Sequence, residues 1–337
     1  MNVSLAREVT GLAESLGAQL TVILGAEQLD RLAELAPDQF RPQFDLLRSE
    51  KFKDLQTAVL VGVYGYDEDF AVRKKQPPGV GGTGIHQNYW KLVNDIGEEL
   101  LRFLEGRAFA GEGTGEGLIP VKYVLNRIGV GKYGKNSLIY TEEYGSYVNN
   151  WYLLFTNAPL EPTHTEVADE PDGLAACGKC GACIARCPTQ AIVAPYQVDM
   201  ERCITYLTHR APSISKEFFE KLGNWVWGCN VCQNICPANA KVIPRAKHKE
   251  AVLHHPGPTG LPPAHKHPFP ILVDDLDPCC DRTYLQNVLI ALGNTGSSND
   301  ESPIRKFSKT PVGLELKEYC DYALKRIAWR TSEKSTA

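Results

Sequence analysis

Residues 177–188 read CGKCGACIARCP, so that four cysteines follow one another at gaps of two, two and three residues and a proline comes directly after the fourth. Residues 229–237, CNVCQNICP, repeat the two- and three-residue gaps and end on a second Cys-Pro pair. Cys203 stands alone between the two runs. Three cysteines at two-residue gaps can wrap three corners of a cube, after which Pro188 turns the chain away. The window from 177 to 236 thus holds eight of the chain's 11 cysteines.

This spacing predicts two [4Fe–4S] clusters. The pattern C-x2-C-x2-C-x3-C-P is that of two-cluster iron–sulfur proteins, in which the fourth cysteine binds the other cluster, and two such clusters need eight thiolates. We expect the first cluster on Cys177, Cys180, Cys183 and Cys236, and the second on Cys187, Cys203, Cys229 and Cys232. Zinc is the alternative metal at C-x2-C spacing, but a zinc site does not need a third cysteine at the same gap or two Cys-Pro pairs.

The composition fits a protein whose thiols stay reduced. The chain has 337 residues, a formal net charge of −4 and no apolar run near the roughly 20 residues of a membrane-spanning helix. Its first residues place Arg7 and Glu8 among the apolar positions, unlike a secretory signal peptide. We therefore expect a cytoplasmic protein without a membrane partner. The cysteines outside the pattern are expected to be ordinary thiols: Cys279, Cys280 and Cys320.

The cysteine-free part of the chain has the pattern of an α/β domain. Residues 58–63, AVLVGV, form an apolar run of strand length, which is typical of a strand buried on both faces. Apolar residues recur at helical spacing over 5–16 and 88–105. Residues 151–155 are a candidate strand, and the glycine-rich residues 111–117 are expected to form a mobile loop.

Composition divides the chain into three parts. Six prolines between residues 254 and 270 exclude a regular helix there, and helical spacing returns around 284–292 and 314–327. The expected domains are an α/β cofactor-binding domain over 1–165, a ferredoxin-like domain with two [4Fe–4S] clusters over 166–250, and a Pro-rich linker with a short helical tail over 251–337.

The cysteine window and a glycine segment before it resemble the epoxyqueuosine reductases. These are cobalamin-dependent iron–sulfur enzymes of queuosine tRNA modification, related in their core to reductive dehalogenases. The likeness is clearest over 177–210, which includes Cys203, and over 227–239, WGCNVCQNICPAN. Residues 127–139, RIGVGKYGKNSLI, look like the family's Gly-Trp-Ile-Gly-Lys-Asn segment. The resemblance covers roughly residues 55–245.

The resemblance implies a reductive-dehalogenase/nitroreductase-like core for the first domain and a corrinoid (cobalamin) placed between the nearer cluster and the substrate. Glycines in the segment 127–139 permit the close approach of a bulky cofactor, and we expect Lys135, Asn136 and Ser137 to contact it. The implied partners are an external electron donor of the ferredoxin or flavodoxin type and a small-molecule or modified-nucleoside substrate. Whether that substrate is part of a tRNA stays open.

Two departures from the family concern the substrate. The family's catalytic acid is an aspartate three residues before a proline, whereas here Gly117 takes that position before Pro120 and the adjacent Glu116 is the candidate acid. The family's Arg- and His-bearing motif before the helix is replaced by residues 81–88, GGTGIHQN. The redox core is unaffected by either change.

Three functions are consistent with these features. The first is an oxidoreductase in which two clusters pass electrons to a bound corrinoid that reduces a substrate. The second is authentic epoxyqueuosine reduction with a relocated acid. The third, from a different class, is a non-catalytic electron-transfer or corrinoid-activating protein. The large cysteine-free domain argues against the third, because a ferredoxin needs little beyond the cysteine window, whereas the missing aspartate argues for it.

Overall fold

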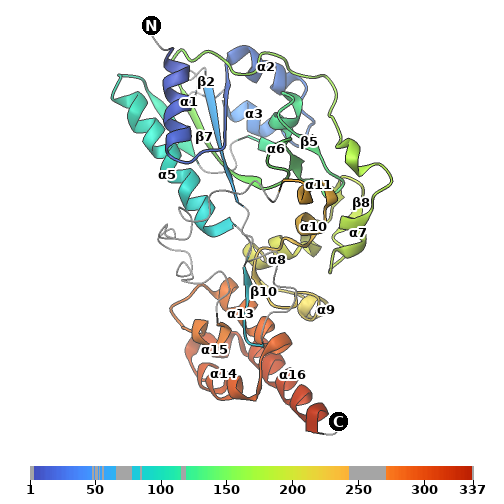
Figure 1. Cartoon of the computed structure of the whole chain (residues 1–337). Coiled ribbons are helices and arrows are strands. Elements are labelled where there is room, and N and C mark those ends of the chain that lie inside the picture. The colour runs from blue at the N-terminus through green and yellow to red at the C-terminus, as the bar shows by residue number, and fades with distance from the viewer. Residues whose placement is uncertain are drawn as a thin grey trace. The chain divides into compact units, whose positions relative to one another are not determined.

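The structure is a computed structural model of the chain, shown in Figure 1. It describes residues 4–47, 49, 52, 54, 57–65, 78–83, 86–114, 119–242 and 271–335. The chain divides into two compact units, each made of separate segments. The first holds Met1–Tyr66, Asn88–Gly181 and Pro237–Pro256, and the second holds Asp67–Gln87, Ala182–Cys236 and Gly257–Ala337.

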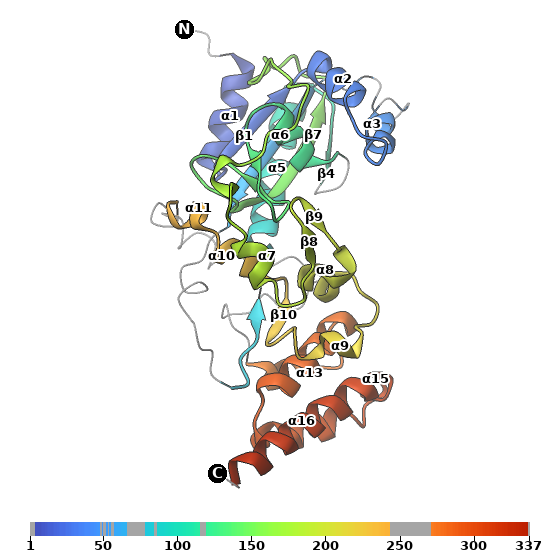
Figure 2. The same ribbon diagram turned by 90° about the vertical axis from the view of Figure 1, so that its right-hand side faces the viewer.

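The first unit is built on a four-stranded antiparallel sheet in the order β1-β2-β7-β4. Its strands are β1 (Leu20–Leu24), β2 (Thr57–Tyr64), β7 (Val148–Thr156) and β4 (Gly111–Thr114). Every residue of β2 is buried, as expected for the apolar run at 58–63. The cause is visible in Figures 1 and 2, where α5 lies on one face of the sheet and α6 on the other.

The first unit also contains helices at both segments of helical periodicity. Its helices are α1 (Leu5–Ser15), α2 (Ala26–Glu34), α3 (Arg41–Leu47), α5 (His86–Glu105), α6 (Val121–Arg127) and α11 (Pro237–Ala240). Both long amphipathic segments are therefore confirmed as helices. In α1 the buried residues are Ala6, Val9 and Ala13, so the smaller side chains of the helix face the sheet.

Two glycine positions are fixed by close packing against the Tyr152 side chain of β7. A Cβ atom at Gly97 of α5 would lie 2.0 Å from a ring carbon of Tyr152, so the helix can sit on this ring only with glycine there. The expectation of a mobile loop is wrong for residues 111–114, which form β4 at the sheet edge. A Cβ atom at Gly113 would lie 1.8 Å from the Tyr152 hydroxyl oxygen, which explains the glycine without mobility.

A buried amide holds the glycine segment that follows α6. Asn126 donates to the carbonyls of Gly131 (2.9 Å) and Asp172 (2.8 Å), and its own oxygen accepts from the Asp172 N–H (3.0 Å). The chain turns at Gly129, whose φ of 76° favours glycine, into the short pair β5 (Lys132–Tyr133) and β6 (Ile139–Tyr140). Within residues 137–140, the extended part is Ile139–Tyr140.

The second unit combines small strand pairs with helices. Its strands are β8 (Ile192–Ala194) and β9 (Gln197–Val198), which form a hairpin, and β3 (Gly82–Thr83) and β10 (Trp225–Trp227), which pair in parallel. The helices are α7 (Ala182–Arg186), α8 (Ile204–His209), α9 (Lys216–Phe219), α10 (Val231–Asn234), α13 (Arg282–Thr295), α14 (Glu301–Phe307), α15 (Pro311–Glu315) and α16 (Lys317–Ser335).

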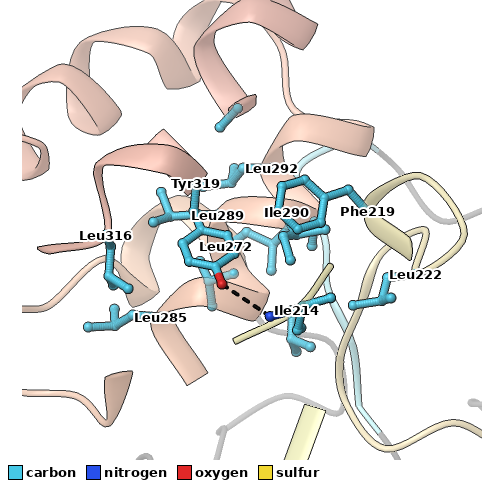
Figure 3. Packing of buried hydrophobic residues seen from close by; sticks show 14 of the residues in the cluster. Ile214, Phe219, Leu222, Leu272, Leu285, Leu289, Ile290, Leu292, Leu316 and Tyr319 are labelled. Carbon is cyan, nitrogen blue, oxygen red and sulfur yellow. Dashed lines mark hydrogen bonds between the residues drawn. The ribbon is translucent and has the colours of Figure 1, made fainter. Parts of the chain in front are cut away.

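One hydrophobic core joins part of the cysteine window to the helical tail. Figure 3 shows Phe219 and Leu222 packed with Leu289 and Tyr319 of α13 and α16, and the Ile214 N–H donates to the Tyr319 hydroxyl (3.2 Å). Helices of six and four residues such as α8 and α9 cannot bury a core of their own. The expected three-part division is therefore not that of the units, because the tail completes this core.

Candidate metal centre

Four of the predicted cluster cysteines lie in the second unit on elements that pack together. Cys187 follows α7, Cys203 is the N-cap of α8, and Cys229 and Cys232 flank the start of α10. Helix α7 packs against α10, and α8 packs against β10, which leads directly to Cys229. The second predicted ligand set is thus brought onto neighbouring elements.

The electrostatics of Cys229 show that these four thiols interact. Burial raises the pKa of the Cys229 thiol well above its ordinary value, and the nearby thiols of Cys232, Cys203 and Cys187 raise it further. These three cysteines are the partners that the spacing predicted for Cys229. The Cys229 thiol, whose ionisation is disfavoured by burial and by these neighbours, needs a positively charged centre close by to be held as a thiolate.

Backbone N–H groups point at two of these sulfurs. The Ala191 N–H donates to the Cys187 Sγ (3.2 Å), and the Val231 N–H donates to the Cys229 thiol and lowers its pKa, against the larger effect of burial. Such donors stabilise sulfur that carries negative charge. The local fold therefore prepares two of the four sulfurs to act as thiolate ligands.

A buried polar network fixes the chain just before Cys229. The Asn287 side chain, fully buried on α13, donates to the carbonyls of Thr208 (2.9 Å) and Val226 (3.0 Å). The Thr208 hydroxyl accepts from the Gly228 N–H (3.0 Å). These positioning residues could not be predicted from the sequence, because Asn287 is far from the cysteines along the chain and belongs to no recognisable motif.

Aromatic rings lie beside the same segment. The Trp227 ring stacks on His209 of α8, with the ring centres 4.3 Å apart and the planes at 35°. Trp225 and Trp227 are only partly buried and pack against the core of the second unit. Apolar rings next to a metal ligand such as the predicted ligand Cys229 limit the access of solvent to it.

The first predicted ligand set is divided between the units. Cys177 and Cys180 belong to the first unit, in and after the short helix η1 (Ala175–Cys177), and Cys183 and Cys236 belong to the second. Within the first unit, the Cys180 N–H donates to the Cys177 carbonyl (2.8 Å), which folds the loop between them into a tight turn. All eight cysteines are partly buried, and none of them forms a disulfide.

The predicted cofactor contacts lie on the turn between β5 and β6, in three different environments. The Lys135 ammonium donates to the carbonyls of Gly178 (2.7 Å) and Cys180 (2.9 Å), so it holds the first cysteine loop. The buried Asn136 amide donates to the Tyr140 hydroxyl (3.0 Å). Ser137 adopts a positive φ of 59°, and its buried hydroxyl has no hydrogen-bond partner among the described residues.

The candidate acid lies outside the described residues, and the described residues contain no site for a single metal ion. Glu116 and Gly117 lie outside them, so the candidate acid has no described position; the described chain resumes just before Pro120, the N-cap of α6. Among the described residues, no group of three or more His, Cys, Asp or Glu side chains is close enough to hold a single metal ion. Thiols around a four-iron cube stand farther apart than thiols around one zinc ion. No described helix has the length and apolarity to cross a membrane.

Comparison with known proteins matches the cysteine window to an iron–sulfur family. The family described as "4Fe-4S double cluster binding domain" matches residues 176–239, a range that contains all eight predicted ligands. The matching family therefore binds two [4Fe–4S] clusters, which agrees with the number of clusters predicted from the spacing.

Comparison of the longer sequence finds epoxyqueuosine reductases. The chain is 42% identical over 128 residues to that of Bacillus subtilis (strain 168), covering 37% of this chain and 30% of the relative. It is 30% identical over 231 residues to that of Cyclobacterium marinum, covering 67% of this chain and 65% of the relative. In these matches the chain spans less than two thirds of each relative.

The fold gives a match over nearly the whole chain. A solved epoxyqueuosine reductase, determined with an epoxyqueuosine-modified tRNA-Tyr stem loop, aligns with a TM-score of 0.70 and 22% identity. The alignment covers 95% of this chain and 89% of that one. At this identity the likeness shows a shared fold. In part of its sequence and in its fold, this chain is similar to the epoxyqueuosine reductases.

Proposed function

We propose that this chain is an iron–sulfur oxidoreductase of the epoxyqueuosine reductase type. The observation that carries the proposal is the grouping of the Cys187, Cys203 and Cys232 thiols around the buried Cys229 thiol, within a segment that matches a double cluster binding domain. When bound, two [4Fe–4S] clusters would supply single electrons and a corrinoid would supply the strongly reducing centre that acts on the substrate.

The cysteines divide into the two ligand sets predicted by their spacing. Cys187, Cys203, Cys229 and Cys232 hold the second cluster, and the Ala191 and Val231 N–H groups assist two of these sulfurs. Cys177, Cys180, Cys183 and Cys236 hold the first cluster, an assignment that rests on spacing alone. Lys135 keeps the loop between Cys177 and Cys180 in place.

The corrinoid is proposed on the turn between β5 and β6. The orphaned hydroxyl of Ser137 supports this site, because a buried hydroxyl without a partner costs about 1–3 kcal/mol unless a ligand satisfies it. Lys135 and Asn136 make their hydrogen bonds to protein groups, so their part is to shape the turn that presents Ser137.

The proposed substrate is an epoxide-bearing modified nucleoside presented in tRNA. The relatives are named for epoxyqueuosine reduction, and a protein of the same fold has been solved with an epoxyqueuosine-modified stem loop. Removal of an epoxide oxygen as water consumes two electrons and two protons. Two clusters can store the two electrons, an external carrier of the ferredoxin or flavodoxin type would replenish them, and Glu116 is the proposed proton donor.

The experiment uses the full chain purified without oxygen. Iron, zinc and cobalt are measured before and after incubation with cobalamin, and the loaded protein is then given epoxyqueuosine-containing tRNA and a chemical reductant. We expect iron, cobalamin uptake and conversion of the nucleoside. Glu116→Gln should slow conversion at least tenfold, whereas Glu142→Gln, at an exposed glutamate, serves as the matched control.

The other outcomes separate the alternative functions. Cobalamin uptake without conversion of the nucleoside would assign the redox core to another substrate. Iron without any cobalamin uptake would favour an electron-transfer or corrinoid-activating protein. Zinc in place of iron would overturn the proposal as a whole.

A further inference from the structure

Asn230 occupies the gap between two predicted ligands of the second cluster, Cys229 and Cys232. It stands at the N-cap position of α10, where an asparagine side chain ordinarily accepts a hydrogen bond from the first turn of the helix. Here the side chain makes no such bond, and the Asn230 carbonyl instead accepts from the N–H groups of Gln233 (3.0 Å) and Asn234 (2.9 Å). The amide group is therefore not used to cap the helix.

The amide is also fully removed from solvent. Asn230 is 0% exposed, and neither its nitrogen nor its oxygen has a hydrogen-bond partner among the described residues. A buried polar group left unpaired costs about 1–3 kcal/mol, so buried amides are almost always satisfied. Asn287 in the same unit is satisfied at its nitrogen, which donates to two carbonyls, whereas only its oxygen has no partner among the described residues.

The residues around Asn230 indicate which group could accept a hydrogen bond from its side-chain amide. Cys229 directly before it and Cys232 two residues after it are predicted ligands. The thiols of Cys203 and Cys187 interact with Cys229 from other elements of the same unit. Other N–H donors in this region, those of Ala191 and Val231, already point at cysteine sulfur. A bound cluster adds sulfur acceptors to the same buried space.

We propose that the Asn230 side-chain amide donates a hydrogen bond to a sulfur of the second cluster and so raises the reduction potential of that cluster. The inference rests on the proposed function, since it requires the cluster. Reduction adds one negative charge to the cluster in a dry environment, and a donor aimed at sulfur stabilises the reduced form more than the oxidised form. Asn230 is thus a positioning residue for electron storage.

The test is a redox titration of the full chain, followed by electron paramagnetic resonance, for wild type, Asn230→Leu and Asn230→Asp. Leucine keeps the size of the side chain and removes the donor. We expect about a tenfold smaller equilibrium constant for one-electron reduction of one cluster, a downward shift of ~59 mV, with the other cluster unchanged. Asn234→Leu, at an exposed amide of the same short helix, is the matched control and should shift neither cluster.

The aspartate variant supplies a readout that a packing role would not give. Its carboxyl group can donate only when protonated, so the potential of the affected cluster should fall as the pH rises, more steeply than in wild type. If Asn230→Leu does not retain its iron, the test rests on Asn230→Asp, which keeps the shape of the side chain. The pH dependence of its cluster potential then shows whether the residue donates to the cluster.

Failure of the role of Asn230 can be distinguished from failure of the proposed function. Wild-type potentials in both variants, with both clusters retained and no added pH dependence, would overturn the role of Asn230 and leave the proposed function standing. Wild-type protein without iron would overturn both.

Discussion

Lys135 connects the glycine segment to the first cysteine loop through a single ammonium group. Its two bonds to the Gly178 and Cys180 carbonyls are charge-assisted, and such bonds contribute about 1.5–3 kcal/mol each when they are protected from solvent. Because Lys135 is only half-buried, the lower end of that range applies. The residue therefore supports the geometry of the loop that carries Cys177 and Cys180.

Lys135→Met is expected to lower the free energy of unfolding by about 1–2 kcal/mol and to speed the loss of iron to a chelator. Lys132→Met is the control, because the ion pair of Lys132 with Asp172 (2.7 Å) lies at the exposed surface and is worth under about 1 kcal/mol. Thermal unfolding and iron release measure both variants. If both variants unfolded at the same temperature and released iron at the same rate, Lys135 would have no role in holding the loop.

Asp275 gives the second unit a pH dependence. Burial raises the pKa of its carboxyl to about 6 from an ordinary value of 3.8, although the Tyr284 hydroxyl donates to it (3.0 Å) and favours the charged form. Because the folded state favours the protonated carboxyl, this stabilising effect is complete below about pH 4 and is lost as the pH rises through about 6.

Asp275→Asn keeps an acceptor for Tyr284 and cannot ionise. Relative to wild type, this variant should gain about 1 kcal/mol of stability between pH 4.5 and pH 8, a value discounted for partial exposure. Unfolding of both proteins by urea at the two pH values measures the gain. Asp274→Asn, at the exposed neighbouring carboxylate, should show no comparable trend.

Single-residue roles in the site could be predicted only where a spacing rule exists. The grouping of Cys187, Cys203, Cys229 and Cys232 follows from the gaps between cysteines, because cluster geometry restricts those gaps. The contacts of Lys135 and the burial of Asn230 follow from no local rule. Both depend on which carbonyls and thiols other segments bring close, and a sequence pattern does not record that information.

At the scale of elements, α5 and β7 are matched through one glycine. Gly97→Ala should destabilise the protein by about 1–3 kcal/mol, because the added carbon meets the Tyr152 ring and overpacks the interface even though alanine is the better helix former. Gly11→Ala in α1 is the control. No atom lies within 4 Å of its added carbon, so it should stabilise the helix by up to ~1 kcal/mol. If the melting temperatures of Gly97→Ala and Gly11→Ala shifted in the same direction, this packing would be contradicted.

Elements with strong periodicity were predictable, and glycine-rich elements were not. The apolar run at 58–63 and the helical spacing at 88–105 correspond to β2 and α5, since their patterns reflect the burial of whole faces. Residues 111–114 form a strand although their glycines predicted a loop. A glycine in a sequence shows that a side chain is absent, but it does not show whether flexibility or close packing requires this. Here the reason is the close approach of Tyr152.

At the scale of the molecule, both units are assembled from segments far apart in the sequence. The cysteine window contributes to the first unit through residues up to Gly181 and to the second through Ala182–Cys236. The helical tail completes the core beneath α8, α9 and β10. Composition changes mark linkers along the chain, but they do not reveal which distant segments share a core, so the three-part division missed this interleaving.

The central claim is that the cysteine window holds two [4Fe–4S] clusters in separate ligand sets. The most direct measurement is iron content with Mössbauer spectroscopy on anaerobically purified wild type, Cys203→Ser and Cys280→Ser. We predict about eight iron atoms per chain for wild type and for Cys280→Ser, and about four for Cys203→Ser, with the remaining iron in one intact [4Fe–4S] cluster. Bound zinc without iron, or a Cys203→Ser protein that keeps both clusters, would contradict the account.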